Sequence, residues 1–209
     1  MDNKIDEKNT NELDTGDVLL FKGTSWLGRI IEYLGVSRYS HVGIVLKNPK
    51  FLNEELEDGL YILESSFNNT PDSEDHLYKL GVQIHRLEDV LKEYSPGSVF
   101  VRHIDTERDD TFYKKLSDIH KEIHNKPYDL DINDWLLAKL NLIIPFPEEK
   151  EFKKTNTFWC SALVSYVYCQ LGWIKKDINW TFIAPREFSS YEGKMICFEC
   201  KIDPEKLFY

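Results

Sequence analysis

The chain has 209 residues, of which 42% are hydrophobic and 13% aromatic, so we expect one folded domain with a sizeable core rather than a disordered protein. Its formal net charge of −10 disfavours a nucleic-acid-binding surface, because phosphate contacts need clustered lysine and arginine. No apolar run approaches the ~18 residues of a transmembrane helix, and four cysteines do not indicate a disulfide framework, which favours an intracellular, cytoplasmic protein.

The first half of the chain is predicted to form short strands and two helices after a polar start. Residues 1–14 are polar and charged and are predicted to form a flexible tail, which leaves 15–209 as the domain. Apolar and β-branched runs bounded by turn residues predict strands over 17–22, 41–46, 60–66, 81–86 and 98–103. Helical spacing of apolar residues predicts helices over 25–34 and 110–125, and residues 68–79 are loop-like.

The second half contains two further apolar segments. Residues 135–146 are apolar and are followed by Pro147, and this segment is open to three interpretations: a core helix, a lid over a cleft, or a surface for lipid. An apolar stripe predicts a helix over 157–171 with Thr157 as its N-cap, and 194–202 is predicted to be the last strand. Strands and helices are mixed without regular βαβ alternation, which favours an α+β fold.

Cys160 is the leading candidate for chemistry, because it lies in the first turn of a predicted helix. Free N–H groups and the helix dipole favour an anion there, and a nearby imidazole would help to hold the thiolate that acts as a nucleophile. His41, at the start of a predicted strand, is the candidate imidazole. The alternative for Cys160 is a buried small residue. Cys169 lies nine residues further on, on the opposite helix face, and is expected in the core.

Glu64 is the candidate third member of this group. In a strand it shares a face with Leu60 and Ile62, and a carboxylate on a partly apolar face needs a partner. An imidazolium of His41 on a neighbouring strand would serve, giving a Cys-His-acid triad. The alternative is an edge-strand acid exposed to water.

Other motifs fit established chemistry less well. His120 and His124 have the i,i+4 spacing of zinc ligands, but a zincin needs glutamate directly after the first histidine, and Glu122 is one place later. No third ligand is apparent in the sequence, so we expect no metal and no other cofactor. Cys197 and Cys200 form a C-x-x-C motif, but in a strand their side chains face opposite ways, which favours a structural role.

Seven segments together resemble the circularly permuted branch of the NlpC-type papain-like cysteine peptidases and amidases, to which lecithin:retinol acyltransferase-like proteins also belong. The match covers most of the chain and runs in order through Thr15–Phe21, Tyr39–Ile44, Ile62–Ser65, Gly81–Ile84, Lys126–Asp129, Phe158–Val164 and Ala184–Phe188. In this branch the histidine precedes the acid and the cysteine, as it does here. The resemblance implies a permuted papain-like α+β fold, with an antiparallel sheet packed against the nucleophile-bearing helix.

The resemblance also implies roles for individual residues. His41 would be the general base, Glu64 its orienting acid and Cys160 the nucleophile, while Tyr128 would lie close to the thiol and help to hold the oxyanion. Many relatives carry glutamate where this chain has Ala162, which leaves a helix-start or substrate contact open.

The expected activity is hydrolysis of an amide, peptide or ester bond through an acyl-enzyme. The alternatives are a lipid acyltransferase or phospholipase with the same triad, and a catalytically inactive binding module. The expected partner is a peptide, amide or lipid acyl substrate rather than nucleic acid, and peripheral contact with a membrane stays open. Members of this branch occur in bacteria and in large DNA viruses, including poxviruses, so a viral source would make the protein virion-associated.

Overall fold

The computed structural model describes residues 7–23, 38–67, 70–128, 156 and 158–209. Within these residues the fold is α+β, as predicted, and is built on a six-stranded antiparallel sheet with the order β4-β3-β2-β1-β5-β8. Its strands are β1 (Val18–Phe21), β2 (His41–Lys47), β3 (Leu60–Phe67), β4 (Leu80–Arg86), β5 (Val99–Arg102) and β8 (Lys206–Leu207). A two-stranded sheet pairs β6 (Ile104–Asp105) with β7 (Lys201–Ile202).

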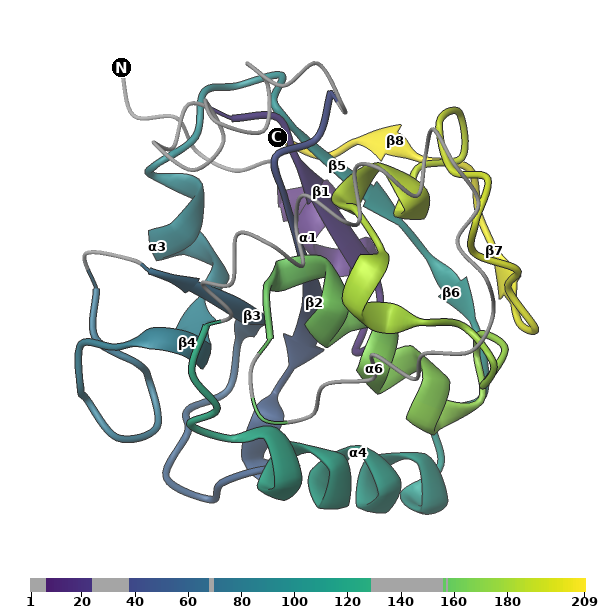
Figure 1. Cartoon of the computed structure of the whole chain (residues 1–209). Helices are drawn as coiled ribbons and strands as arrows, with labels where there is room; N and C mark the ends of the chain where they lie inside the picture. Colours follow the sequence, from purple (N-terminus) through teal and green to yellow (C-terminus); the bar gives the residue numbers. More distant parts are fainter. Residues whose placement is uncertain (1–6, 24–37, 68–69, 129–155, 157) are drawn as a thin grey trace.

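Helices cover both faces of the six-stranded sheet (Figure 1). Helix α6 (Cys160–Leu171) packs on β2 and β3, and α4 (Asp110–Ile123) packs against α6. Helix α3 (Leu87–Leu91) packs against β3 and β4, and α1 (Glu7–Glu12) precedes β1. Short 3-10 helices span Pro49–Phe51, Trp180–Phe182 and Pro185–Phe188. No helix in the described part of the chain is long and apolar enough to cross a membrane.

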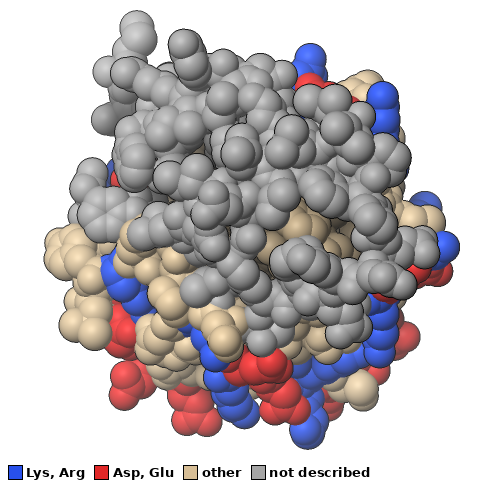
Figure 2. Space-filling model, viewed as in Figure 1, with Lys and Arg blue, Asp and Glu red and all other residues tan. Residues whose placement is uncertain are grey.

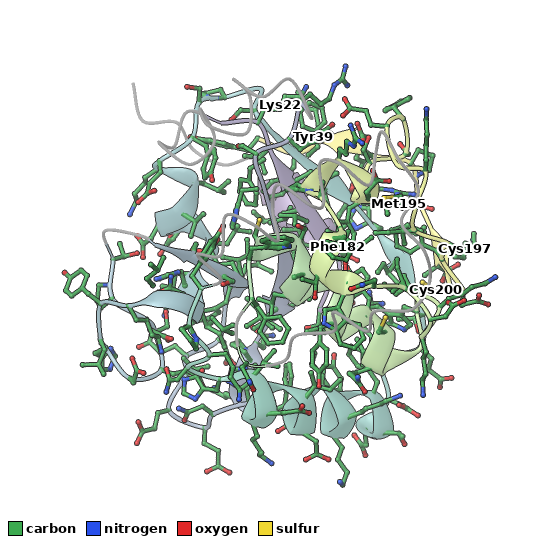
Figure 3. All side chains as sticks on the ribbon, viewed as in Figure 1. Lys22, Tyr39, Phe182, Met195, Cys197 and Cys200 are labelled. Carbon is green, nitrogen blue, oxygen red and sulfur yellow. The ribbon has the colours of Figure 1, made fainter. Side chains whose placement is uncertain are left out.

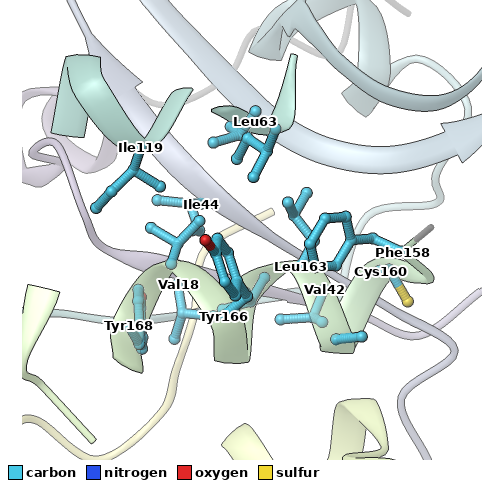
Figure 4. Packing of buried hydrophobic residues seen from close by; sticks show 14 of the residues in the cluster. Val18, Val42, Ile44, Leu63, Ile119, Phe158, Cys160, Leu163, Tyr166 and Tyr168 are labelled. Atoms are coloured by element: carbon cyan, nitrogen blue, oxygen red, sulfur yellow. The ribbon is translucent and has the colours of Figure 1, made fainter. Parts of the chain in front are cut away.

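Side chains alternate between two hydrophobic clusters, one on each face of the sheet, because successive residues of a strand point to opposite faces. In β3, Leu63 belongs to the cluster beneath α6, and Ile62 belongs to the cluster that contains Val90 of α3. Figure 4 shows the first cluster, in which Leu163 and Tyr166 of α6 lie beside the strands. The sheet is therefore buried on both sides, which holds the residues of its central strands in place.

Helix α4 is amphipathic, as its apolar spacing predicts. The carboxylate of Asp109 caps its start by accepting a hydrogen bond of 2.8 Å from the backbone N–H of Phe112. Leu116, Ile119 and Ile123 are buried. Lysine, arginine, aspartate and glutamate side chains gather along the lower edge of the molecule, over α4 (Figure 2).

The predicted strands over 17–22, 41–46, 60–66, 81–86 and 98–103 and the helix over 110–125 are confirmed to within a few residues. The last predicted strand, 194–202, is wrong for most of its length, because only Lys201–Ile202 pairs, with β6. Of the predicted tail, residues 7–12 form α1 and Leu13 is fully buried. The predicted helix over 25–34, the apolar segment 135–146 and Thr157 lie outside the described residues.

Gly81 gives the first testable prediction, because it joins β4 to the segment that leads toward Cys160. Its φ is +148°, it forms an isolated bridge with Pro127, and an added Cβ would overlap the carbonyl oxygen of Lys126. Gly81→Ala is expected to cost about 1–3 kcal/mol, which lowers the melting temperature by about 5 °C in thermal unfolding. Gly97→Ala is the matched control, with φ of +87° but no atom within 4 Å of the added Cβ. Equal losses in the two variants would contradict a steric origin.

Candidate active site

Cys160 is the first residue of α6, three residues later than the predicted helix start. Trp159 is the N-cap, and its side chain makes no capping hydrogen bond, so the N–H groups of the first turn are not used by that side chain. Two hydroxyls anchor this helix start: Ser65 Oγ donates to the Phe158 carbonyl and Ser161 Oγ donates to the Ile183 carbonyl, each at 2.5 Å. The chain is thus held on both sides of the thiol.

Cys160 is 4% exposed as a whole residue, and its thiol lies at the edge of the first cluster. Figure 4 shows its sulfur pointing away from Leu163 and Tyr166. Cys169 is confirmed as a core residue, and its Sγ is 3.3 Å from the carbonyl oxygen of Lys175. The two cysteines of α6 therefore differ in their surroundings, as the helical period predicts.

His41 links the thiol to Glu64. It is the first residue of β2, and its Nε2 is 2.5 Å from Glu64 Oε2. His41 also hydrogen-bonds the Cys160 side chain. The structure thus brings together all three residues predicted as a triad.

Charge interactions favour the ionised forms of this pair. Burial opposes a charge on His41, but hydrogen bonds to Cys160 and Glu64 outweigh it and raise the pKa of His41 to about 10. Burial also opposes the carboxylate of Glu64, which is 1% exposed, but hydrogen bonds from His41 and His85 hold its pKa well below the ordinary value. An imidazolium and a carboxylate therefore face each other at neutral pH.

His85 is a further residue of the site, which the sequence alone does not single out. Its Nδ1 is 3.1 Å from Glu64 Oε1, and its Nε2 is 3.2 Å from the carbonyl oxygen of Thr70. Both ring nitrogens face acceptors, so both carry protons, and the charge and hydrogen bond of Glu64 raise the pKa of His85 against the effect of burial. Glu64 of β3 pairs with Gln83 of β4, and His85 lies two residues after Gln83. The side chain of His85 is therefore on the same face of the sheet as that of Glu64.

The four groups form a chain whose charges can cancel. His85 and His41 as imidazoliums contribute two positive charges, and the Glu64 carboxylate contributes one negative charge. The sum is zero only when Cys160 is a thiolate.

Tyr94 is a second residue that sequence reasoning missed, because no motif marks it. Burial and then the charges of Glu64, Glu93 and Cys160 raise the pKa of Tyr94, so its hydroxyl-bearing ring lies near the site. Its ring centroid is 4.7 Å from that of Phe21. Tyr94 therefore packs against the second cluster, on the face of the sheet that α3 covers.

Tyr128 lies on the segment that runs beside the helix start. Its backbone N–H donates to the Leu80 carbonyl at 3.2 Å, and the Phe158 N–H donates to the Pro127 carbonyl at 3.0 Å. The Tyr128 side chain is partly buried against the first cluster. These backbone hydrogen bonds bring Pro127 and Tyr128 close to the start of α6 and to Cys160. The oxyanion role of Tyr128 stays a prediction.

The C-x-x-C motif lies apart from the triad. Figure 3 shows Cys197 and Cys200 on the side of the molecule that carries β7, with Cys197 exposed. Cys200 Sγ is 3.7 Å from the carbonyl oxygen of Trp173. Between the two cysteines, only Phe198 forms an isolated β-bridge, with Ile174. The strand predicted at this motif is therefore wrong.

Glu64→Gln tests the orienting role of the carboxylate. The amide keeps the size of the side chain but removes the charge that raises the pKa of His41, so imidazolium is less favoured. The pH at which Cys160 alkylation by iodoacetamide reaches half of its alkaline plateau is expected to rise by at least about one unit. Glu57→Gln, an exposed carboxylate, is the control. An unchanged profile in Glu64→Gln would make Glu64 a bystander.

Comparison with known proteins leaves the chemistry open. No family model and no curated protein matches the chain. Among solved structures, the chain is similar to the metalloprotein yiiX from Escherichia coli O157:H7, with 19% identity and a TM-score of 0.47. The match covers 76% of this chain and 66% of that one, just under two thirds. At this TM-score the likeness does not establish a shared fold.

Proposed function

We propose that the protein is a thiol hydrolase of the permuted papain-like type, with Cys160 as nucleophile, His41 as general base and Glu64 as the acid that orients it. The observation that carries this proposal is the hydrogen-bonded chain from Cys160 through His41 to Glu64, with the thiol at a helix start. The order of these residues and the antiparallel sheet packed against α6 also agree with the permuted branch.

The proposed reaction uses the thiolate to attack an amide or ester carbonyl. The carbonyl electron pair moves to oxygen, and we expect the N–H groups at the start of α6, with Tyr128, to stabilise that oxyanion. The intermediate collapses as imidazolium of His41 gives its proton to the departing amine or alcohol, which leaves an acyl-enzyme and a neutral ring. His41 then takes a proton from water, and hydroxide attack releases the acid and restores the thiolate.

Glu64 and His85 serve the proposed reaction without touching the substrate. Glu64 holds the His41 ring by Nε2, which keeps the ring oriented toward the thiol and stabilises imidazolium. His85 holds the other carboxylate oxygen of Glu64 and is itself held by the Thr70 carbonyl. This extended support limits rotation of the base between the two proton transfers.

Two alternatives share the same residues. A lipid acyltransferase or phospholipase would use the same thiolate on an ester, with the acyl group passed to a second lipid or to water. A binding module would keep the cleft but not turn over. The lipid enzyme differs from an amidase in the substrate that forms a covalent adduct, whereas a binding module would form no adduct at Cys160.

The test is labelling with a panel of electrophiles, matched in warhead and differing in a peptide or an acyl-chain recognition group. Mass spectrometry then maps the modified residue. Labelling of Cys160 ahead of Cys169, Cys197 and Cys200 is expected, and hydrolysis of the matching amide or ester should follow. Peptide probes reacting faster would support the amidase, and acyl-chain probes reacting faster would support the lipid enzyme. Preferential modification of Cys197 or Cys200 would contradict the proposal.

A further inference from the structure

A second cluster of polar side chains lies between the β3–β4 loop and the end of α4. The sequence places His120 and His124 one turn apart, and the fold adds the third ligand that the sequence does not reveal, Glu74 of the loop. Glu74 Oε2 is 2.8 Å from His120 Nε2 and 3.4 Å from His124 Nε2. The ligand atoms of all three side chains lie within 4.8 Å of one another.

The geometry suits a small metal ion. Around a tetrahedral zinc ion with bonds of ~2.0–2.1 Å, neighbouring ligand atoms are about 3.3 Å apart, so the two contacts of Glu74 would each change by about half an ångström or less. The side chains of His120 and Glu74 are 4% and 6% exposed, and His124 is 28% exposed. His124 is therefore the most exposed of the three side chains, although its Nε2 atom is buried.

The two imidazoles face the same carboxylate. Their ring centroids are 5.1 Å apart and the rings are stacked. His124 Nε2 is buried and makes no hydrogen bond within the described part of the chain, although it lies 3.4 Å from Glu74 Oε2. A bound ion would give this buried nitrogen a partner.

The local charge also leaves room for a divalent cation. Asp72, Glu74 and Asp75 contribute three negative charges, and Lys79 contributes one positive charge through contacts of 2.5 Å to Asp72 and 2.8 Å to Asp75. These three carboxylates and the lysine together leave two negative charges. Lys79 forms ion pairs with both aspartates, whereas Glu74 is the carboxylate that contacts both histidines.

The loop that carries Glu74 is held in place before any ion binds. The backbone N–H of Ser73 donates to the Ile84 carbonyl at 2.8 Å, and the N–H of Glu74 donates to Asp72 Oδ1 at 2.8 Å. On the other side, Ile119 and Ile123 fix α4 against the core. A site built on two anchored elements binds an ion at a smaller entropic cost.

We infer that His120, His124 and Glu74 form a zinc-type metal site that fastens the β3–β4 loop to the end of α4. Nitrogen and carboxylate donors suit zinc, with water as the fourth ligand. The same loop contains Thr70, whose carbonyl oxygen is 3.2 Å from His85 Nε2, and α4 leads directly to the segment at Pro127. The metal site would thus stabilise the segments that support Cys160. The inference does not depend on whether the thiol is catalytic.

The experiment uses the full chain after chelator treatment, with Zn²⁺ alone as the ligand in calorimetry near pH 7. We expect one ion per chain and, at a hundredfold excess over Kd, a melting temperature about 5 °C higher or more. Co²⁺ in place of zinc should give tetrahedral absorption without sulfur-to-cobalt charge transfer, because no thiolate is a ligand. A sulfur band would instead assign the ion to the cysteines and overturn the inference.

Variants separate this site from adventitious binding. Glu74→Gln keeps the shape of the ligand but not its charge, and is expected to weaken binding by at least the ~10–100-fold that loss of an outer partner costs. His124→Gln, at the accessible helix end, should do the same, and circular dichroism of both metal-free variants checks their fold. His76→Gln, exposed in the same loop, should bind as the unmodified chain does. No binding, or binding unchanged in Glu74→Gln and His124→Gln, would overturn the inference.

Discussion

His41→Gln is expected to remove most of the reactivity of Cys160 at acidic pH. The pKa of His41 is raised to about 10, so the ring is positively charged throughout the neutral and mildly acidic range and favours a thiolate beside it. An unassisted cysteine, with an ordinary pKa of ~8.5, is ionised in only about one molecule in 300 at pH 6. The alkylation rate at pH 6, taken relative to its own alkaline plateau, should therefore fall by up to about 300-fold.

The comparison with the plateau matters because a thiolate stabilised by a cation is also a weaker nucleophile. Rates are measured with iodoacetamide across the pH range, and mass spectrometry reads modification of Cys160 alone. His76→Gln is the matched control, since it removes an exposed histidine of the β3–β4 loop. A profile in His41→Gln that coincides with that of the unmodified chain would show that the imidazole does not support the thiolate.

Cys160→Ala is expected to abolish turnover of whichever amide or ester the electrophile panel identifies. In the proposed reaction the acyl-enzyme forms on its sulfur, and alanine offers no atom that can form that bond. Loss of a nucleophile that acts together with its base typically costs about 10⁴-fold or more in kcat. The decrease is measured with purified chain at saturating substrate.

Cys169→Ala is a stringent control for this variant, because it makes the same change at a buried position of the same helix. It should lose stability through a small cavity but keep turnover at temperatures where it is folded. Thermal unfolding of both variants separates the two effects. Turnover that survives in Cys160→Ala would place the nucleophile elsewhere, and turnover lost equally in both would indicate a structural cause.

Removing one histidine partner of Glu64 or both of them separates an effect on the reaction from an effect on the stability of the fold. In His41→Gln the carboxylate keeps His85, whose Nδ1 lies 3.1 Å away, so the fold is expected to persist. Removal of both histidines would leave a buried carboxylate without its two charged partners, which is strongly destabilising. The single variants are therefore the informative ones for the reaction.

Local patterns in the sequence were enough to predict the main elements and to predict that Cys160, His41 and Glu64 lie together. The strands β1 to β5 show as apolar runs bounded by turn residues, and α4 and α6 show as apolar residues at helical spacing. Short elements were not predicted: α3 has five residues and β8 has two, too few for either period to be visible. The incorrect strand over 194–202 has the same origin, because an apolar run does not say whether a partner strand lies beside it.

The roles of His85 and Glu74 were decided only by the tertiary structure. His85 meets Glu64 because β3 and β4 pair in one register, and a shift of a single residue would turn the histidine to the other face. Glu74 meets His120 because a loop between two strands folds back onto a helix 46 residues further along the chain. Periodicity along a sequence determines which face of an element is buried, whereas register and loop path depend on contacts between distant segments, so one sequence read by itself predicts the first and not the second.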